Sequence, residues 1–417
     1  MRAITGLMRS IRSKGIAAAT ALLALSSFAG SAGAVRLETA FAAETAELPA
    51  PPGNHAAAAA LADVTSGRIL FSERGDEPMK IASLTKIMTA IVAIEHGGLD
   101  ETIRVSAKAA GKEGSSIYLK AGEKMTLRNA LYGLMLRSGN DAATAIAEHV
   151  GGSVEGFAFL MNRKAEELGL ANSHFMNPHG LDEQGHYSSA NDLAKLTVYA
   201  LHNPEFRQIV KTRVKTAPNP NDSWDYKWVN KNKMLTMYEG ADGVKTGYTK
   251  QALRTLVTSA TRGGQQLVAV TLNDRDDWAD HRRLLDYGFA HFPLSTVAKP
   301  GEPLRDFPYE TKAGFVYPFA KGERELLEIK LAPLKEETVQ YRLGYRGQLK
   351  FYLRDRLIGT VPLVADPEKE QLLRAKEDAR SAESQTLSAG DHRKAFGTSL
   401  RSAIRALLLQ GEANATW

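Results

Sequence analysis

The order in which strand-like and helix-like segments follow one another constrains the fold of this chain most. Residues 56–63 and 68–72 read as two strands around the turn Thr65-Ser66-Gly67, and residues 255–260 and 267–272 form a second hairpin around Gly263 and Gly264. Helical spacing of apolar residues lies between the hairpins, at 83–97, 127–136, 141–150, 154–168 and 191–201. Strands at both ends predict an α/β (α+β) domain with a helical insertion, whose sheet joins its first and last segments.

A second, smaller domain is expected after Pro300 and Pro303. Short alternating apolar runs follow these prolines, at 315–317, 326–331, 339–343, 348–353 and 357–364. They predict a small all-β domain, and a chain of 417 residues is long enough for both domains. We place the main domain at 43–297, the small all-β domain at 298–365 and a charged, Ser/Ala-rich linker at 366–392.

The N-terminal segment has the features of an export signal. Basic residues at Arg2, Arg9, Arg12 and Lys14 precede an Ala-rich apolar stretch, residues 15–30, that is short for a membrane-spanning helix. We therefore interpret residues 1–42 as a secretory signal peptide cleaved after Ala42, with Ala32-Gly33-Ala34 as a second possible cleavage site. The alternative is an uncleaved anchor. We therefore expect the protein to be exported and to act at the outer face of the cytoplasmic membrane or in the cell wall.

Net charge and cysteine content argue against several kinds of function. Residues 1–42 hold five basic side chains and one acidic one, so their removal lowers the net charge from +6 to +2. Such a balance argues against a nucleic-acid partner, which usually requires clustered Lys and Arg. The chain contains no cysteine, which excludes thiol catalysis, thiolate metal sites and disulfides.

The C-terminal segment, residues 393–417, has the pattern of an amphipathic helix. One face of the helix is apolar and another is basic: Phe396, Leu400, Ala403, Ile404, Leu407 and Leu408 on the first, and Lys394, Arg401 and Arg405 on the second. This division is typical of a helix that lies in a membrane surface. An amphipathic helix docked on the protein itself is the alternative.

A first catalytic motif, Ser83-Leu84-Thr85-Lys86, lies at the start of the helix expected at 83–97. The i, i+3 spacing puts the Ser83 hydroxyl and the Lys86 amine on one helical face. A serine needs an adjacent base to become a nucleophile, and Lys86 is such a base if burial and neighbouring cations lower its pKa. Taken alone, the motif favours a surface Ser and Lys on an ordinary helix.

A second motif, Ser138-Gly139-Asn140, lies in a loop between two expected helices. The Ser138 hydroxyl can relay a proton between a lysine and a leaving amine, and the Asn140 amide can bind a substrate carbonyl and contact the lysine. Since Ser, Gly and Asn are all favoured at helix caps, this motif alone does not decide between catalysis and capping.

A third motif, Lys245-Thr246-Gly247, leads into the last hairpin. Lys245 and Thr246 on a strand edge can hold a carboxylate, and Gly247 leaves room for a bound peptide. The backbone N–H of Tyr248 can complete an oxyanion hole with that of Ser83. An ordinary edge strand with a solvated lysine is the alternative for this motif in isolation.

In this order, on helix, loop and strand, the three motifs resemble those of penicillin-recognising serine peptidases and β-lactamases. Longer stretches are similar to the low-molecular-mass penicillin-binding proteins, the serine-type D-Ala-D-Ala carboxypeptidases of peptidase family S11: ASLTKIMT at 82–89, NPHGL at 177–181, HYSSANDL at 186–193 and DGVKTGYT at 242–249. Residues 297–365 resemble the C-terminal β domain of that family, and the terminal helix resembles its membrane anchor. The resemblance implies a penicillin-binding transpeptidase-like fold.

The resemblance also implies a reaction and its catalytic residues. Ser83 is implied as the acylated nucleophile, Lys86 as the proton acceptor, and Ser138 with Asn140 as the proton-relay pair. The implied substrate is a peptidoglycan stem peptide ending in D-Ala-D-Ala, and β-lactams are implied as covalent inhibitors. No cofactor and no metal are implied.

Lys245 and Thr246 are implied as the groups that bind the substrate carboxylate, together with Gly247 and Tyr248 on the same strand. Members of the family also use an arginine beyond the last hairpin, for which Arg275 and Arg282 are candidates. One departure is Leu253, where many relatives have Gly. The run NDRDDWADH at 273–281 is similar to the spore-cortex branch of the family.

Three other functions remain possible at this point. A β-lactamase needs a carboxylate that activates water, but Glu166 and Glu167 have the pattern of a solvated helix face. A penicillin-sensing module that is acylated without turnover differs little in sequence. A zinc peptidase is suggested by three histidines, His174, His179 and His186, but no HExxH spacing is present.

Overall fold

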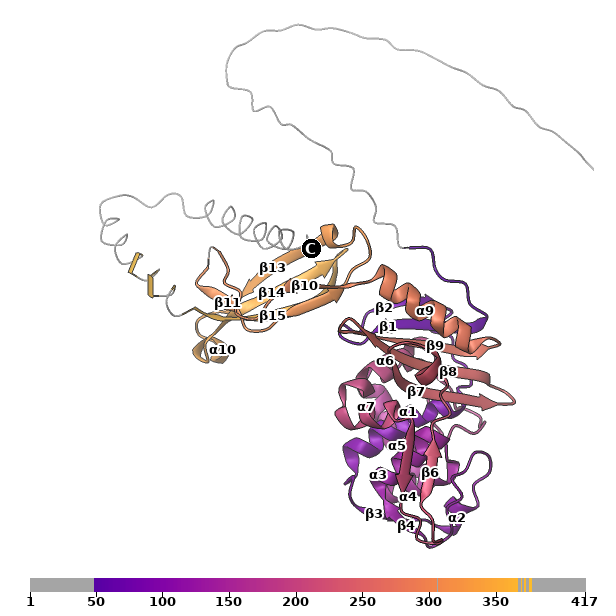
Figure 1. The fold of residues 1–417 in the computed structure, drawn as a ribbon. Helices are drawn as coiled ribbons and strands as arrows, with labels where there is room; N and C mark the ends of the chain where they lie inside the picture. Colours follow the sequence, from indigo (N-terminus) through magenta and orange to yellow (C-terminus); the bar gives the residue numbers. More distant parts are fainter. Residues whose placement is uncertain (1–48, 306, 367–368, 370, 373–374, 377–417) are drawn as a thin grey trace, which may run out of the picture. The chain divides into compact units, whose positions relative to one another are not determined.

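The computed structural model describes residues 49–305 and 307–366, together with 369, 371–372 and 375–376 (Figure 1). The predicted signal peptide at 1–42 and the predicted membrane segment at 393–417 lie outside the described residues, as does most of the predicted linker at 366–392. Within the described part of the chain, no helix is both long and apolar enough to cross a membrane.

A five-stranded antiparallel sheet forms the centre of the main domain, in the order β2-β1-β9-β8-β7. Its strands are β1 (Ala56–Asp63), β2 (Ile69–Glu73), β7 (Ala241–Thr249), β8 (Leu253–Arg262) and β9 (Gln265–Asp274). The pairing of β1 with β9 confirms the prediction that the sheet joins the first and last segments of the domain.

Helices fill the sequence between the two hairpins and also follow the second one (Figure 1). The longer ones are α1 (Thr85–His96), α3 (Leu127–Tyr132), α4 (Asn140–Gly151), α5 (Val154–Glu167), α6 (Ala190–His202), α7 (Pro204–Lys211) and α9 (Asp277–His291), and two single turns are α2 (Ala107–Ala110) and α8 (Met234–Met237). All five helical segments expected from the sequence are confirmed. Helices α7 and α9 were not predicted from the sequence.

The sheet separates two hydrophobic cores because its residues alternate between its faces. On β1, Ala58, Ala60 and Ala62 belong to the core shared with the helices α1 to α7, whereas Ala59 and Leu61 belong to the core under α9. Both faces of the strand are therefore buried, which explains why its sequence is a nearly continuous apolar run.

Two small hairpins extend the helical part of the domain. One pairs β3 (Thr102–Arg104) with β4 (Lys124–Thr126), and the other pairs β5 (Val214–Ala217) with β6 (Tyr226–Val229). The loops at their ends contact each other, since Glu123 accepts hydrogen bonds from the Asn221 side chain at 2.7 Å and from the Tyr226 hydroxyl at 2.9 Å.

The sequence after α9 forms two further sheets, whose strands have a hydrophobic core of their own. A two-stranded sheet pairs β10 (Leu294–Ala298) with β12 (Phe315–Pro318), and a four-stranded sheet has the order β11-β15-β14-β13, with β11 (Tyr309–Thr311), β13 (Leu327–Pro333), β14 (Tyr345–Leu353) and β15 (Arg356–Ala365).

One predicted strand of this region is wrong. Residues 339–343 form the helical turn α10 (Val339–Arg342) instead. Its cap explains the difference, because the Thr338 side chain accepts a hydrogen bond from the backbone N–H of Tyr341. This bond satisfies a free donor of the first helical turn and outweighs the strand propensity of the β-branched and aromatic residues.

Candidate active site

Ser83 lies in a 3-10 turn, Ala82–Leu84, immediately before α1. Ala82 has a left-handed φ of +49°, and its carbonyl accepts a hydrogen bond from the Thr85 hydroxyl at 2.8 Å. Ser83 is partly exposed, whereas its neighbours Leu84 and Thr85 are buried. The turn is therefore fixed to the core while Ser83 itself stays accessible from one side.

His186 holds this turn from the opposite side. Its Nδ1 accepts the backbone N–H of Met176 at 3.1 Å, so the proton of the neutral ring is on Nε2, 2.7 Å from the Thr85 hydroxyl oxygen. Burial lowers the pKa of His186 to about 3, which keeps the ring neutral near pH 7. The histidine thus acts as a fixed hydrogen-bond bridge behind Ser83.

Lys86 is a fully buried lysine one helical turn after Ser83. Its Nζ lies 3.0 Å from the Ser83 Oγ, 2.8 Å from the Asn140 Oδ1 and 2.6 Å from the His179 carbonyl. Burial, and then the nearby charge of Lys245, hold the pKa of Lys86 well below its usual range. A neutral amine has a free lone pair, so in this form it can accept the Ser83 hydroxyl proton.

The Ser138-Gly139-Asn140 motif contacts Lys86 through the Asn140 side chain. Asn140 is the first residue of α4, and its Nδ2 donates to the Glu113 carbonyl at 2.7 Å while its Oδ1 accepts from Lys86. Ser138 has a left-handed φ of +66°, and its buried Oγ makes no hydrogen bond within the described residues. A buried hydroxyl without a partner is uncommon, and this one lies two residues from the Lys86 contact.

The Lys245-Thr246-Gly247 motif lies on β7, at the edge of the sheet beside Ser83. Lys245 is buried, and its Nζ donates to the carbonyl of Thr246 at 2.8 Å. Burial, and then the charge of Lys231, lower the pKa of Lys245 to about 7. Thr246 and Gly247 are partly exposed and Tyr248 is exposed, so this part of β7 is accessible to a ligand.

Two charged residues that the sequence analysis missed belong to this site. Lys231 is exposed, donates to the Ser115 hydroxyl at 3.2 Å, and its charge lowers the pKa of both Lys86 and Lys245. Asp141 is fully buried, and its charge acts in the opposite direction on the pKa of Lys86. No motif marks Lys231, but Asp141 follows Asn140 directly and could have been noticed as a charge at a helix start.

Asp141 organises the loop beside the site. Its carboxylate accepts the Ser116 hydroxyl at 2.6 Å and the backbone N–H groups of Leu119 at 3.1 Å and Ala142 at 2.9 Å. The N–H of Ile117 points at the same carboxylate, at 3.1 Å. A carboxylate with several such donors is stable in a buried position and fixes the loop at 116–119 against α4.

The residues that suggested a β-lactamase or a zinc peptidase have contacts that fit neither function. Glu166 and Glu167 are exposed on α5, where Glu167 accepts a hydrogen bond from Lys164 at 2.6 Å. This agrees with the solvated helix face expected for them. Among the three histidines, His174 contacts the Gly185 carbonyl through its Nδ1 at 2.8 Å, and the described residues hold no group of three or more possible metal ligands.

Neither candidate arginine touches the site within the described residues. Arg275 and Arg282 are both exposed, and the structure shows no hydrogen bond from either to the residues described above. Leu253, which stands where many relatives have Gly, has a left-handed φ of +55°. Such a conformation is easy for glycine and strained for leucine.

The comparisons with known proteins agree on one family. Residues 44–276 match the family model of peptidase S11, described as D-alanyl-D-alanine carboxypeptidase. This match spans more than half of the 417 residues. The chain belongs to the S11 family of serine peptidases.

Individual relatives extend the similarity in sequence and in fold. The D-alanyl-D-alanine carboxypeptidase DacF of Bacillus subtilis is 36% identical over 271 residues, which cover 63% of this chain and 69% of the relative. DacD of Escherichia coli is 32% identical over 361 residues, which cover 79% and 90%. The crystal structure of penicillin binding protein 6B from Escherichia coli has a TM-score of 0.61 at 30% identity and covers 76% of this chain and 98% of that one.

These matches confirm the family recognised from the motifs and the mixed α/β penicillin-binding-protein fold. The spore-cortex branch stays a prediction.

Proposed function

We propose that this chain is a serine-type D-Ala-D-Ala carboxypeptidase that removes the terminal D-Ala of peptidoglycan stem peptides through an acyl-enzyme on Ser83. The observation that supports this proposal most directly is the distance of 3.0 Å between the Lys86 Nζ and the Ser83 Oγ, in a position where burial lowers the pKa of the amine. The family match supports the same reaction, since its model is described as D-alanyl-D-alanine carboxypeptidase.

In the proposed acylation, the Ser83 Oγ attacks the carbonyl carbon of the penultimate D-Ala while neutral Lys86 takes the hydroxyl proton. The backbone N–H groups of Ser83 and Tyr248 stabilise the oxyanion. The amide bond then breaks and its nitrogen takes a proton from Lys86 through the Ser138 hydroxyl. The Ser138 Oγ suits this relay because no residue that the structure describes forms a hydrogen bond with it that would have to be displaced.

The substrate carboxylate has a separate binding region in this proposal. Lys245 and Thr246 hold it on β7, and Gly247 lets the peptide backbone approach the strand. Asn140 binds a substrate carbonyl and keeps Lys86 in place through the contact at 2.8 Å. Lys231 adds a second positive charge close to Lys245, and this charge favours an anionic substrate end.

Deacylation returns the enzyme to its starting state. Water attacks the ester carbon, its proton passes to Lys86, and the Ser83 Oγ leaves as the hydroxyl, which releases the shortened peptide as a carboxylic acid. A β-lactam is attacked in the same way, but its leaving nitrogen stays attached to the acyl group after ring opening. The retained group blocks the approach of water, so penicillins remain bound as covalent inhibitors.

The proposal also covers where the protein acts and how its chain is divided into domains. Carboxypeptidases of this family act on peptidoglycan outside the cytoplasm. We propose export through residues 1–42, a peptidase domain at 43–297, a separate small all-β domain at 298–365 and attachment to the membrane surface through residues 393–417. The charge pattern of the last segment and the β strands between Leu294 and Ala365 support this division.

Labelling with a fluorescent penicillin tests the proposal, with release of D-Ala from a peptide ending in D-Ala-D-Ala as the second measurement. Wild type is expected to be labelled and to release D-Ala, and Ser83→Ala to do neither. Label retained by Ser83→Ala would mean that another residue is the nucleophile. Labelling without D-Ala release would indicate a penicillin sensor, and rapid loss of the label with hydrolysed penicillin would indicate a β-lactamase.

A further inference from the structure

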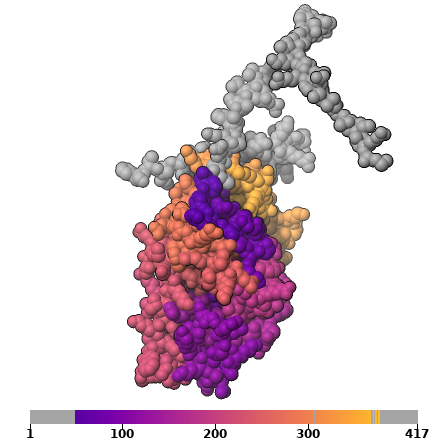
Figure 2. Space-filling model, turned by 90° about the vertical axis from the view of Figure 1, so that its right-hand side faces the viewer, coloured from indigo at the N-terminus to yellow at the C-terminus, as the bar shows by residue number. Residues whose placement is uncertain are grey.

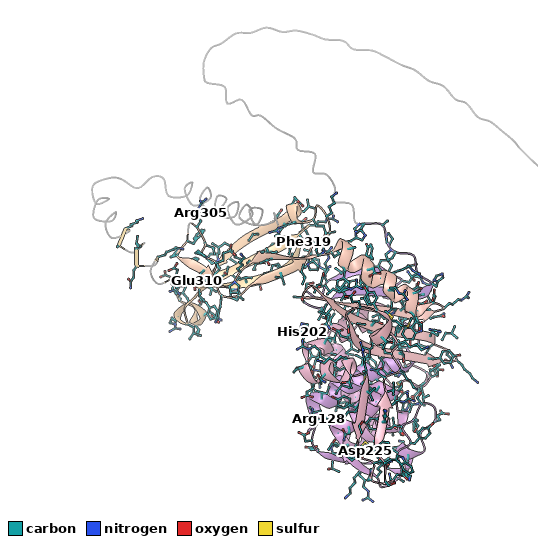
Figure 3. The ribbon with its side chains drawn as sticks, viewed as in Figure 1. Arg128, His202, Asp225, Arg305, Glu310 and Phe319 are labelled. Carbon is teal, nitrogen blue, oxygen red and sulfur yellow. The ribbon has the colours of Figure 1, made fainter. Side chains whose placement is uncertain are left out.

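A hollow of about 660 Å³ lies beside the proposed active site and has no part in the mechanism above. One wall is the loop that contains Tyr118, and the other is the segment from Asn219 to Val229, which includes β6. In the space-filling view the purple surface near residue 120 and the pink surface near residue 225 lie side by side (Figure 2). Asp225 in Figure 3 marks the second wall.

Direct contacts connect this hollow with the active site. Ser116, at its edge, donates its hydroxyl to Asp141, the residue after Asn140. Arg137, also in its lining, is the residue before Ser138 and donates to the Val229 carbonyl at 3.2 Å. Both walls of the hollow are thus held by residues that neighbour Ser138 and Asn140 in the sequence.

Two aromatic side chains in the lining are exposed, and one of them, Tyr118, lies on well-fixed backbone. Tyr118 is 83% exposed and Trp224 is 67% exposed. The backbone of Tyr118 is held in a left-handed conformation, φ +65°, by a hydrogen bond of 2.7 Å from its N–H to the Ser116 hydroxyl. Large exposed rings on a fixed loop provide contact area with little loss of entropy on binding, which is typical of a recognition surface.

The polar groups in the lining largely neutralise one another. Lys120 lies 3.8 Å from Asp222, and the Asn219 amide donates to the same carboxylate at 3.2 Å. The other charges of the lining, Arg137, Lys227 and Asp225, leave a net charge of one. Such a lining does not favour a strongly charged ligand, but it offers donors and acceptors to a neutral ligand rich in hydroxyl groups.

We propose that this hollow is a subsite for a neutral pyranose, the sugar to which the stem peptide of the substrate is joined. A pyranose has C–H-rich faces that stack on aromatic rings, where the negative ring face meets positive C–H groups, and hydroxyl and amide groups around its edge. Tyr118 and Trp224 supply the rings, and Asn219 with Asp222 supplies the edge contacts. The inference rests on the proposed carboxypeptidase function and adds the glycan as a recognised part of its substrate.

Steady-state D-Ala release from two substrates tests this subsite. One is a free pentapeptide ending in D-Ala-D-Ala, and the other is the same pentapeptide on an N-acetylglucosaminyl-N-acetylmuramic acid disaccharide. The variants are Tyr118→Ala and Trp224→Ala, which remove exposed rings without opening the core. Phe159→Ala is the matched control, because Phe159 is 61% exposed on α5 and does not line the hollow.

The expected result is a fall of about tenfold in kcat/KM for the disaccharide-linked peptide in Tyr118→Ala and Trp224→Ala, with the free pentapeptide within about twofold of wild type. Phe159→Ala should leave both substrates unchanged. An equal fall for both substrates would show that the hollow receives peptide, and no change for either would show that it receives nothing; both results overturn the inference.

A failure of the carboxypeptidase proposal is distinguishable from a failure of this subsite. If wild type releases D-Ala from neither substrate, the reaction is misassigned. Binding of the disaccharide with its lactyl carboxyl group amidated, and therefore neutral, then decides the inference and is measured by saturation-transfer NMR. Binding by wild type that is lost in Trp224→Ala would support the subsite. Absence of binding, or equal binding by both proteins, would overturn it.

Discussion

Gly247 packs so closely against Ser83 that a Cβ on Gly247 would lie 3.1 Å from the Ser83 backbone nitrogen. The same atom would lie 2.4 Å from the Oγ1 of Thr255, which donates to the Ile81 carbonyl at 3.2 Å. Strand β7, strand β8 and the turn before α1 therefore meet at a point with no space for a side chain. This contact fixes the distance between the nucleophile and the strand proposed to bind the substrate.

A methyl group at this point is expected to slow acylation. Gly247→Ala must displace the Thr255 hydroxyl, and the 3.1 Å approach to the Ser83 nitrogen also pushes β7 and the Ser83 N–H apart. Loss of one oxyanion donor lowers rates by roughly 100-fold or more. The second-order rate of labelling by a fluorescent penicillin measures the effect. Gly53→Ala is the control, because a Cβ at Gly53 meets nothing within 4 Å. A labelling rate of Gly247→Ala within twofold of wild type would contradict the proposed role of this contact.

Lys245 is expected to make substrate binding depend on pH. Because burial lowers the pKa of Lys245 to about 7, its amine is charged below that pH and increasingly neutral above it. A charged amine binds a carboxylate better, so KM for a peptide ending in D-Ala-D-Ala should rise about tenfold between pH 6 and pH 8.5.

A peptide with a C-terminal carboxamide is the control for this prediction, since it lacks the anionic group. Its KM should be higher than that of the acid at pH 6 and should change little with pH. A pH dependence that is the same for the acid and the carboxamide would show that Lys245 does not recognise the carboxylate by charge.

The sequence predicted those parts of the site that depend on local geometry. Helical spacing alone puts Lys86 on the same face as Ser83, and the observed contact of 3.0 Å agrees with it. The hairpin of β8 and β9 was also predicted from the residue pattern on both sides of Gly263 and Gly264. Because Asn140 and Lys245 are brought to Ser83 by long-range packing, their positions followed only from the family resemblance.

The parts that the sequence did not predict depend on tertiary contacts. The carbonyl of His179 accepts a hydrogen bond from Lys86, and a backbone carbonyl has no sequence signature. Helix α9 was missed because the first part of its buried face carries Asp277, Asp280 and His281, so that the apolar stripe begins only at Leu284. Lys231 reaches the site from a loop in which no motif distinguishes it from other lysines.

Asp141 is expected to influence catalysis through the pKa of Lys86. Its negative charge raises the pKa of that lysine, against the larger effects of burial and of Lys245, so Asp141→Asn should lower the pKa further. The acidic limb of the pH profile for penicillin acylation should therefore move to lower pH. The variant should also be less stable, because an amide cannot accept all the donors that face the carboxylate.

A second buried carboxylate separates these two effects. Asp192 is also fully buried, and it accepts the N–H of Asn172 at 2.7 Å and the hydroxyl of Ser173 at 2.9 Å. Asp192→Asn should lower the melting temperature but leave the acidic limb where it is in wild type. If both variants moved the limb equally, general destabilisation and not the charge of Asp141 would be the cause.

His281 is expected to make the fold sensitive to acid. Its ring is fully buried, and burial lowers its pKa to about 3. The Nε2 lies 3.0 Å from the Thr271 hydroxyl, and the Nδ1 has no hydrogen-bond partner within the described residues. The unfolded chain binds a proton near pH 6.5, so between pH 6.5 and pH 3 it holds more protons at this position than the folded protein does. Stability is therefore lost as the pH falls through this window, by up to about 1.4 kcal/mol per pH unit.

Urea unfolding at pH 7 and pH 4.5 measures this loss as a difference in the free energy of unfolding. His281→Leu removes the titrating group and should lose less stability between the two pH values than wild type, although His186 still contributes. Thr271→Val is the matched control, because it removes the hydrogen-bond partner and keeps the histidine, so its loss on acidification should equal that of wild type. An acid sensitivity of His281→Leu equal to that of wild type would show that this ring is not the group that resists protonation in the folded state.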